Sequence, residues 1–182
     1  MKDQNFGKPS VVILLIASIL GRLLPHPANF TPLGGAALFG GAKIGRPWNY
    51  LGPLFVLFIT DLVIGLHGTM AYVYAGFVLT VFMGEQVLKG KPSLIKVGVT
   101  GLAGSLVFFI VSNFGVWAEG LMYPKTLTGL IDCYIAAIPF FRNSLIGDAV
   151  FSVGFFGLYQ LAENRGLAAQ FDKTVISWLG NK

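Results

Sequence analysis

Long apolar runs, separated by proline, glycine and charged residues, divide the chain into six predicted membrane spans. These spans cover residues 10–24, 31–43, 50–66, 70–88, 94–113 and 143–162. Intervals without a charged residue extend for 20 residues after Arg22, 23 after Asp61 and 22 after Lys96. A helix needs about 20 apolar residues to cross the hydrocarbon core of a bilayer. The pattern therefore predicts an all-α membrane protein in which residues 1–182 form a single integral domain.

Two segments depart from the pattern of long spans. The second apolar run contains Gly34, Gly35, Gly40 and Gly41, which allow close helix packing and indicate a short or broken span. Residues 125–138 are apolar but too few to cross a bilayer. We therefore expect a short helix at the outer face between the fifth and sixth spans.

The composition supports a membrane protein. Hydrophobic residues make up 54% of the chain and charged residues only 12%, whereas soluble domains carry about 25% charged residues. Lys2 and Lys8 precede the first apolar run as in a signal peptide, but Arg22 and the absence of a small-residue cleavage site favour a retained span. The single cysteine, Cys133, excludes an intrachain disulfide.

The basic residues are distributed unequally over the predicted loops, and this predicts the orientation. With a cytoplasmic amino terminus, the outer side holds only Arg22, Lys125 and Arg142. The ten inner basic residues are Lys2, Lys8, Lys43, Arg46, Lys89, Lys91, Lys96, Arg165, Lys173 and Lys182. An excess of basic residues in cytoplasmic loops is typical of membrane proteins. The net charge of +5 thus indicates membrane topology and not nucleic-acid binding, and we expect both termini in the cytoplasm.

Polar side chains are concentrated at the predicted outer end of the bundle. Polar groups in or near hydrocarbon cost a few kcal/mol and usually mark a binding or transport path. Three prolines, Pro25, Pro27 and Pro32, stiffen the first outer loop. We expect the loops after spans one, three and five to form a substrate-binding pocket. The candidate residues are Arg22, His26, Asn29, Phe30, Asp61, His67, Asn113, Trp117, Arg142, Asn143 and Asp148.

Structural roles for the same residues stay open. The two arginines are also suited to interaction with lipid headgroups, and Trp117 to the aromatic belt at the membrane interface. Asp61 or Asp148 is equally suited to pairing with an arginine and holding helices together. The two histidines are predicted to form hydrogen bonds in loops, and no metal site is expected.

Several motifs resemble a family of uncharacterised bacterial membrane proteins related to the S components, the substrate-binding subunits of energy-coupling factor (ECF) vitamin transporters. The motifs are residues 22–32 (RLLPHPANFTP), 34–42 (GGAALFGGA), 61–67, 113–117 (NFGVW) and 138–148 (IPFFRNSLIGD). The resemblance implies a six-helix ECF S-component-like bundle in the bacterial cytoplasmic (inner) membrane, with its ligand bound at the outer face. It also implies a transmembrane T component and two ATPases as partners. The A-x-x-x-A pattern of S-component helix one has its nearest match in Ala17 and Gly21.

The leading hypothesis is a non-enzymatic subunit that binds a vitamin-like or cofactor-precursor molecule. The chain has no G-x-x-x-x-G-K-[ST] phosphate loop, and neither a catalytic residue nor a cofactor is predicted. Arg22 and Arg142 are available to anionic groups of the ligand, and Phe30, Trp117 and Tyr134 to flat apolar surfaces. One minority possibility is a corrinoid whose metal is bound by a histidine or by the lone cysteine.

Two other classes of function are weighed against this hypothesis. A membrane enzyme acting on a lipid or isoprenoid diphosphate would use His26 or His67 as acid or base, with Asp61 orienting it. The chain contains no H-E-x-x-H, no D-D-x-x-D and no nucleophile elbow. An ion-coupled carrier would use Asp61 and Asp148 as titrating groups, but no internal repeat is visible.

Overall fold

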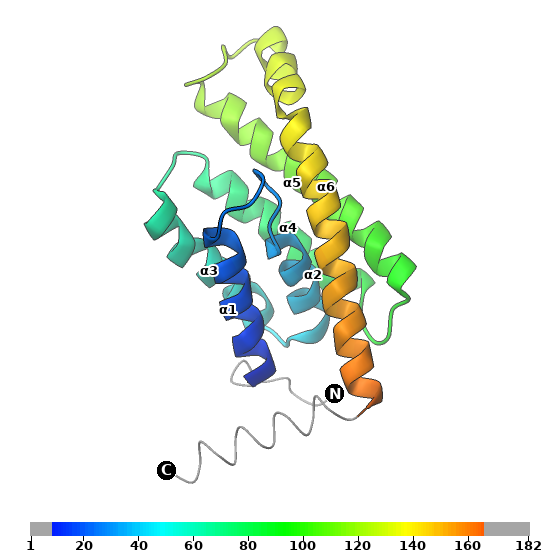
Figure 1. Ribbon diagram of the computed structural model, residues 1–182. Coiled ribbons are helices and arrows are strands. Elements are labelled where there is room, and N and C mark those ends of the chain that lie inside the picture. Colours follow the sequence, from blue (N-terminus) through cyan, green and yellow to red (C-terminus); the bar gives the residue numbers. More distant parts are fainter. Residues whose placement is uncertain (1–8, 166–182) are drawn as a thin grey trace.

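The structure, a computed structural model, describes residues 9–165, with side chains from Leu14 onward. These residues form six helices and no strand, which confirms the predicted all-α class (Figure 1). The helices are α1 (Pro9–Leu23), α2 (Leu33–Lys43), α3 (Trp48–Ile64), α4 (Met70–Val87), α5 (Leu94–Glu119) and α6 (Leu127–Asn164). The predictions for Lys2, Lys8, Lys173, Lys182 and the two termini lie outside the described residues.

Three of the helices are long and apolar enough to cross a membrane: α4, α5 and α6. α1 and α3 are apolar but shorter. α2 has 11 residues and is therefore about 17 Å long, well short of the roughly 30 Å hydrocarbon core. The glycine-rich run 31–43 is thus a short helix, in keeping with its composition, and the structure indicates a membrane protein with three candidate spans.

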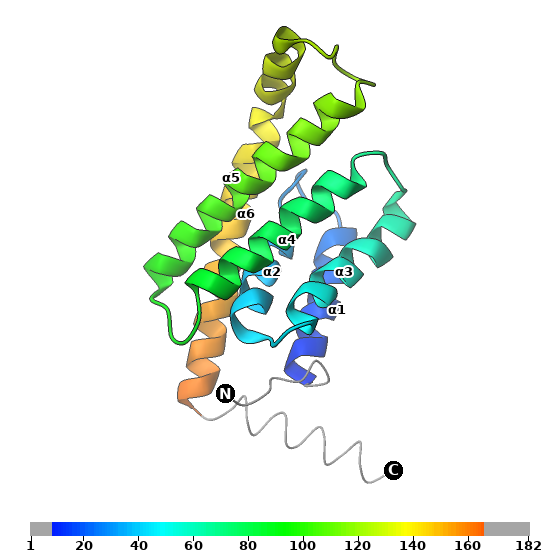
Figure 2. The same cartoon turned by 180° about the vertical axis from the view of Figure 1, so that it is seen from behind.

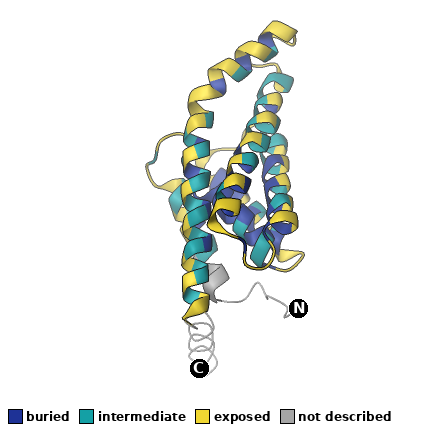
Figure 3. Cartoon of the chain, turned by 90° about the vertical axis from the view of Figure 1, so that its right-hand side faces the viewer, coloured by how far each residue is buried: buried dark blue, intermediate teal, exposed yellow. Residues whose placement is uncertain are grey.

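α2 lies at the centre of the bundle and is buried along most of its length. Its glycines allow other helices to approach its backbone closely: a Cβ on Gly35 would lie 2.8 Å from the Ser152 nitrogen of α6, and one on Gly41 would overlap the Val81 carbonyl of α4. Seen from behind, α4 runs between α5 and α3 (Figure 2). Figure 3 shows that buried residues lie mainly where the helices face one another and that exposed residues lie on the outward faces, and many of these exposed residues are large and apolar. Such faces suit contact with lipid.

The separate outer helix predicted over residues 125–138 does not form. Residues 127–138 are instead the first part of α6, which continues through Pro139 to Asn164 as one helix of 38 residues. α5 extends to Glu119, beyond the predicted end at residue 113, and gives this part of α6 a packing partner. The Tyr134 hydroxyl donates a hydrogen bond to the Ile110 carbonyl at 2.7 Å. The two helices therefore form a hairpin that projects beyond the rest of the bundle (Figure 1).

The loops fall at two opposite ends of the bundle. Loops 44–47 and 88–93 and the carboxyl-terminal end of α6 meet at one end, which we call the basic end. There the Lys43 ammonium donates to the Gly90 carbonyl at 2.6 Å, and the Gln160 amide to the Pro92 carbonyl at 2.8 Å. The described basic residues in or beside these segments are Lys43, Arg46, Lys89, Lys91, Lys96 and Arg165. Loops 24–32, 65–69 and 120–126 lie toward the other end.

Candidate small-molecule binding site

A cavity of about 230 Å³ lies where loops 24–32 and 65–69 meet the helices. Five helices contribute to its wall, so it sits inside the bundle and not on one helix face. We call it the polar cavity. Its lining residues are Arg22, Asn29, Thr31, Leu33, Gly34, His67, Val73, Phe77, Thr80, Phe108, Ser144 and Asp148.

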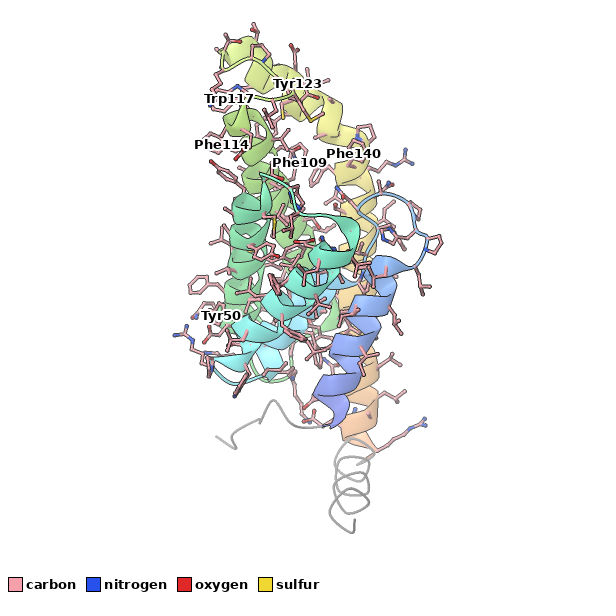
Figure 4. All side chains as sticks on the ribbon, turned by 90° about the vertical axis from the view of Figure 1, so that its left-hand side faces the viewer. Tyr50, Phe109, Phe114, Trp117, Tyr123 and Phe140 are labelled. Carbon is pink, nitrogen blue, oxygen red and sulfur yellow. The ribbon has the colours of Figure 1, made fainter. Side chains whose placement is uncertain are left out.

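A second cavity of about 280 Å³ adjoins the first between α5 and α6. The two cavities share four lining residues: Asn29, Val73, Phe108 and Ser144. Because its other lining side chains are mostly apolar, we call it the aromatic cavity. Phe109 of α5 and Phe140 of α6 contribute to its wall, and Figure 4 shows them between the two helices. A polar and an aromatic compartment thus lie next to each other.

Arg22 and Asp61 form a buried ion pair that joins α1 to α3. The Arg22 Nη2 lies 2.7 Å from the Asp61 Oδ1, and the two side chains are 16% and 1% exposed. The Arg22 Nη1 also donates to the Thr60 hydroxyl. The Tyr74 hydroxyl of α4 donates to the Asp61 Oδ2 at 2.9 Å. The structure therefore supports the pairing role for this arginine and aspartate, and only Arg22 lines the polar cavity.

Asp148 of α6 supplies the carboxylate of the polar cavity. Its Oδ2 accepts a hydrogen bond from the Ser105 hydroxyl of α5 at 2.6 Å. The carboxylate lies against Gly34 so closely that a Cβ at this glycine would overlap it. Gly34 is in the first turn of α2, where the helix dipole places partial positive charge. Three helices thus fix the position of this side chain.

Three other predicted residues also line a cavity. Asn29 lines both cavities and has a φ of 62°, a left-handed conformation that asparagine tolerates better than most residues. His67 lines the polar cavity, and its Nδ1 lies 2.8 Å from the Thr69 hydroxyl. Asn113 lines the aromatic cavity, and its amide donates to the Phe109 carbonyl at 2.8 Å.

The remaining predicted residues line neither cavity, and most of them shape loop 24–32 or the α5–α6 hairpin. The His26 ring lies 2.8 Å from the Pro27 carbonyl and 3.1 Å from that of Arg22. Phe30 packs on Phe151 with ring centroids 5.5 Å apart. The Asn143 amide donates to the Ala28 carbonyl at 2.9 Å.

Trp117 and Arg142 both lie away from the polar cavity, the first near the projecting end of the hairpin and the second on the exposed surface of α6. The indole of Trp117 donates to the carbonyls of Pro124 and Thr126 at 3.1 and 3.2 Å, and so ties loop 120–126 to the end of α5. Figure 4 shows Trp117 and Tyr123 near this projecting end. Arg142 is exposed on α6. Loop 120–126 therefore contributes no side chain to either cavity.

A family model matches residues 3–170, which is nearly the whole chain, and its description is "Family of unknown function (DUF6580)". The chain belongs to DUF6580. No curated protein and no solved structure matches it. The family description assigns no activity, so the resemblance of this DUF6580 protein to ECF S components stays a prediction.

Several cavity residues of the DUF6580 chain were not predicted from the sequence. Phe77, Thr80, Phe108 and Ser144 line the polar cavity from α4, α5 and α6. Small and apolar residues within long helices are as typical of packing as of a site, and helix periodicity does not show which face meets a cavity. Gly101 and Ser105 have a spacing of small residues that indicates close helix contact, but this spacing does not predict that the Ser105 hydroxyl donates to Asp148.

The described part of the DUF6580 chain holds no group of three histidine, cysteine, aspartate or glutamate side chains suited to a metal ion. Cys133 is buried between α5 and α6, with its Sγ 3.4 Å from the Asn113 carbonyl. The two histidines lie in different loops, each with a nearby hydrogen-bond partner. These positions fit structural roles for the three side chains.

A second ionic cluster joins the helices at the basic end of the DUF6580 chain. Arg46 in loop 44–47 donates from Nε and Nη2 to the two carboxylate oxygens of Glu85, both at 2.9 Å. The Tyr50 hydroxyl donates to the same carboxylate at 2.7 Å. The hydrogen bond to Glu85 raises the pKa of Arg46. This bidentate contact fixes loop 44–47 on α4.

Proposed function

We propose that this protein is a membrane-embedded, non-enzymatic binding subunit of an ECF-type uptake transporter, and that it takes a vitamin-like or cofactor-precursor molecule into the polar and aromatic cavities. The observation that carries the proposal is the pair of adjoining cavities inside a bundle with three candidate membrane spans. Arg22, Asn29, His67 and Asp148 were predicted as binding residues, and all four line the polar cavity. Polar groups converging within an apolar bundle are typical of a ligand site.

The proposed orientation has the cavities toward the outer side of the bacterial cytoplasmic membrane. The grouping of Lys43, Arg46, Lys89 and Lys91 near the basic end supports it, because basic loops favour the cytoplasmic side. In this orientation α2 is a short crossing enclosed by the other helices, and both termini are cytoplasmic. The ligand then enters from outside through the loops.

The energy for transport is proposed to come from partner subunits. The chain lacks the phosphate-loop motif, so a T component and ATPases would supply it. Ala17 is exposed on α1, whereas Gly21 packs against Pro32, so closely that a Cβ at this glycine would lie 2.6 Å from the proline Cγ. The contact with a T component would therefore use Ala17 and its exposed neighbours Ile16 and Leu20.

Ligand retention in two matched leucine variants tests the proposed function. Ala137 lines the aromatic cavity, whereas its neighbour Ala136 is exposed on α6. Ala137→Leu adds three carbons inside the cavity, and Ala136→Leu adds the same three outside it. Native mass spectrometry of the detergent-purified proteins, expressed in the native host, should show one bound small molecule in wild type and Ala136→Leu, and loss of it in Ala137→Leu.

The same preparation separates the competing functions. A wild-type protein without a bound molecule, or equal retention by both folded variants, would contradict the proposal. Chemical turnover of the released molecule by the protein alone would indicate an enzyme. Uptake into liposomes on an ion gradient, without any ATPase, would indicate a carrier.

A further inference from the structure

The two charged residues of the polar cavity are in different electrostatic situations. Arg22 is paired with Asp61 at 2.7 Å, and its other terminal nitrogen donates to Thr60 and to the Leu57 carbonyl. Its positive charge is therefore balanced by a buried carboxylate within the protein. A ligand anion would have to compete with that contact for the guanidinium.

Asp148 has no such balance. No lysine or arginine in the described part of the chain forms an ion pair with it. It accepts a hydrogen bond from the neutral hydroxyl of Ser105 at 2.6 Å, and a carboxylate has about four acceptor positions. The first turn of α2, at Gly34, offers partial positive charge but no counter-ion. Arg22, its partner Asp61 and Asp148 together therefore carry one negative charge in excess, and Asp148 is the carboxylate of this group that lines the cavity.

Aromatic rings lie in the wall of the cavity that this carboxylate lines. Phe77 and Phe108 line the same cavity, with ring centroids 4.8 Å apart. The faces of aromatic rings attract cations. The aromatic cavity continues from Phe108 to Phe109 and Phe141, which stack with centroids 4.4 Å apart. A carboxylate in a cavity that phenylalanine rings also line, next to the aromatic cavity, suits a molecule that is cationic at one end and apolar at the other.

We propose that the ligand is an organic cation, with its ammonium group against Asp148 and Phe108 and its apolar body in the aromatic cavity. This inference rests on the proposed function and names the substrate class for it. It reverses the expectation that Arg22 and Arg142 receive an anionic ligand, because Arg22 is paired internally and Arg142 lines neither cavity.

The test compares two probes of similar size and opposite charge. Binding of 2-phenylethylammonium and of 3-phenylpropionate to the detergent-purified protein is measured by calorimetry at pH 7. Wild type should bind the cation about tenfold more tightly than the anion, since a hydrogen bond to a charged group is worth about that ratio or more. Measurements on wild type alone can overturn the proposal. They would do so if the two probes bound equally, if the anion bound more tightly, or if the cation did not bind.

Two asparagine variants locate the effect. Asp148→Asn keeps the shape of the side chain and an oxygen for Ser105, and should weaken binding of the cation about tenfold. Asp132→Asn makes the same change at an exposed position of α6 that lines neither cavity, and should leave binding unchanged. Unchanged binding in folded Asp148→Asn would overturn the assignment of this residue.

The natural ligand distinguishes failure of this inference from failure of the proposed function. A neutral or anionic molecule released from wild type and lost in Ala137→Leu would overturn the cation inference and leave the binding function standing. The reverse outcome is also distinguishable. If cation binding depends on Asp148 but the protein chemically converts its ligand, or carries it without an ATPase, the cation site is supported and the proposed role as a transporter subunit is rejected.

Discussion

The buried pair between Arg22 and Asp61 makes a sharp prediction for stability. Arg22→Met removes the positive partner of Asp61 and leaves a carboxylate that is 1% exposed, to which the Tyr74 hydroxyl still donates. Breaking a buried pair on one side costs about 3–5 kcal/mol, because the other charge stays buried and unpaired. We expect a loss of that size in the free energy of unfolding.

The double variant Arg22→Met/Asp61→Asn tests the cause of this loss. It removes both charges, and should recover most of the stability because no uncompensated charge remains. The exposed pair between Lys91 and Glu163, 3.6 Å apart with side chains 69% and 39% exposed, provides the matched control. Lys91→Met should cost less than about 1 kcal/mol.

The measurement is reversible unfolding in mixed micelles, followed by circular dichroism for all three variants and wild type. A cost for Arg22→Met as small as that for Lys91→Met would refute the reasoning. The same conclusion would follow if the double variant were as unstable as the single one, since the lost stability would then come from packing of the arginine stem.

Two further predictions concern helix packing and the projecting hairpin. Gly41→Ala should destabilise the fold by about 1–3 kcal/mol because its Cβ would overlap the Val81 carbonyl. Gly154 has open space around it, so Gly154→Ala should be neutral or slightly stabilising in the same unfolding assay. Equal changes in the free energy of unfolding for the two variants would contradict the packing argument. Trp117→Phe removes the two hydrogen bonds to loop 120–126 and should speed amide exchange there, measured by mass spectrometry, without changing exchange in α2. Unchanged exchange in the loop would argue against its attachment through the indole.

Much of the fold could be predicted from the sequence. Long intervals without a charged residue indicate apolar helices, and prolines, glycines and charged residues mark where those helices end. The sequence did not predict that residues 127–138 join α6. The helix passes through Pro139, and the contacts of Tyr134 with Phe109 and Ile110 of α5 hold its first part in place. Local sequence does not report such partners.

The candidate site was predicted in part for a similar reason. Rare polar residues such as Arg22 and Asp148 stand out in an apolar chain, so their place at the cavity was accessible to reasoning from the sequence. The sequence did not show that, among the described residues, Arg22 forms an ion pair whereas Asp148 does not. Asp61 pairs with Arg22, whereas Asp148 accepts a hydrogen bond from the neutral Ser105, and that difference depends on which helices are neighbours.

The length of α6 bears on the membrane that suits this protein. Its 38 residues extend about 57 Å, nearly twice the roughly 30 Å hydrocarbon thickness, and a typical tilt of about 20° shortens that only slightly. The surplus carries exposed isoleucines, Ile131, Ile135 and Ile138, which are poorly suited to bulk water. Hydrophobic mismatch then favours a greater tilt or a thicker surrounding bilayer. The lipid acyl-chain length should therefore influence how stable the hairpin is.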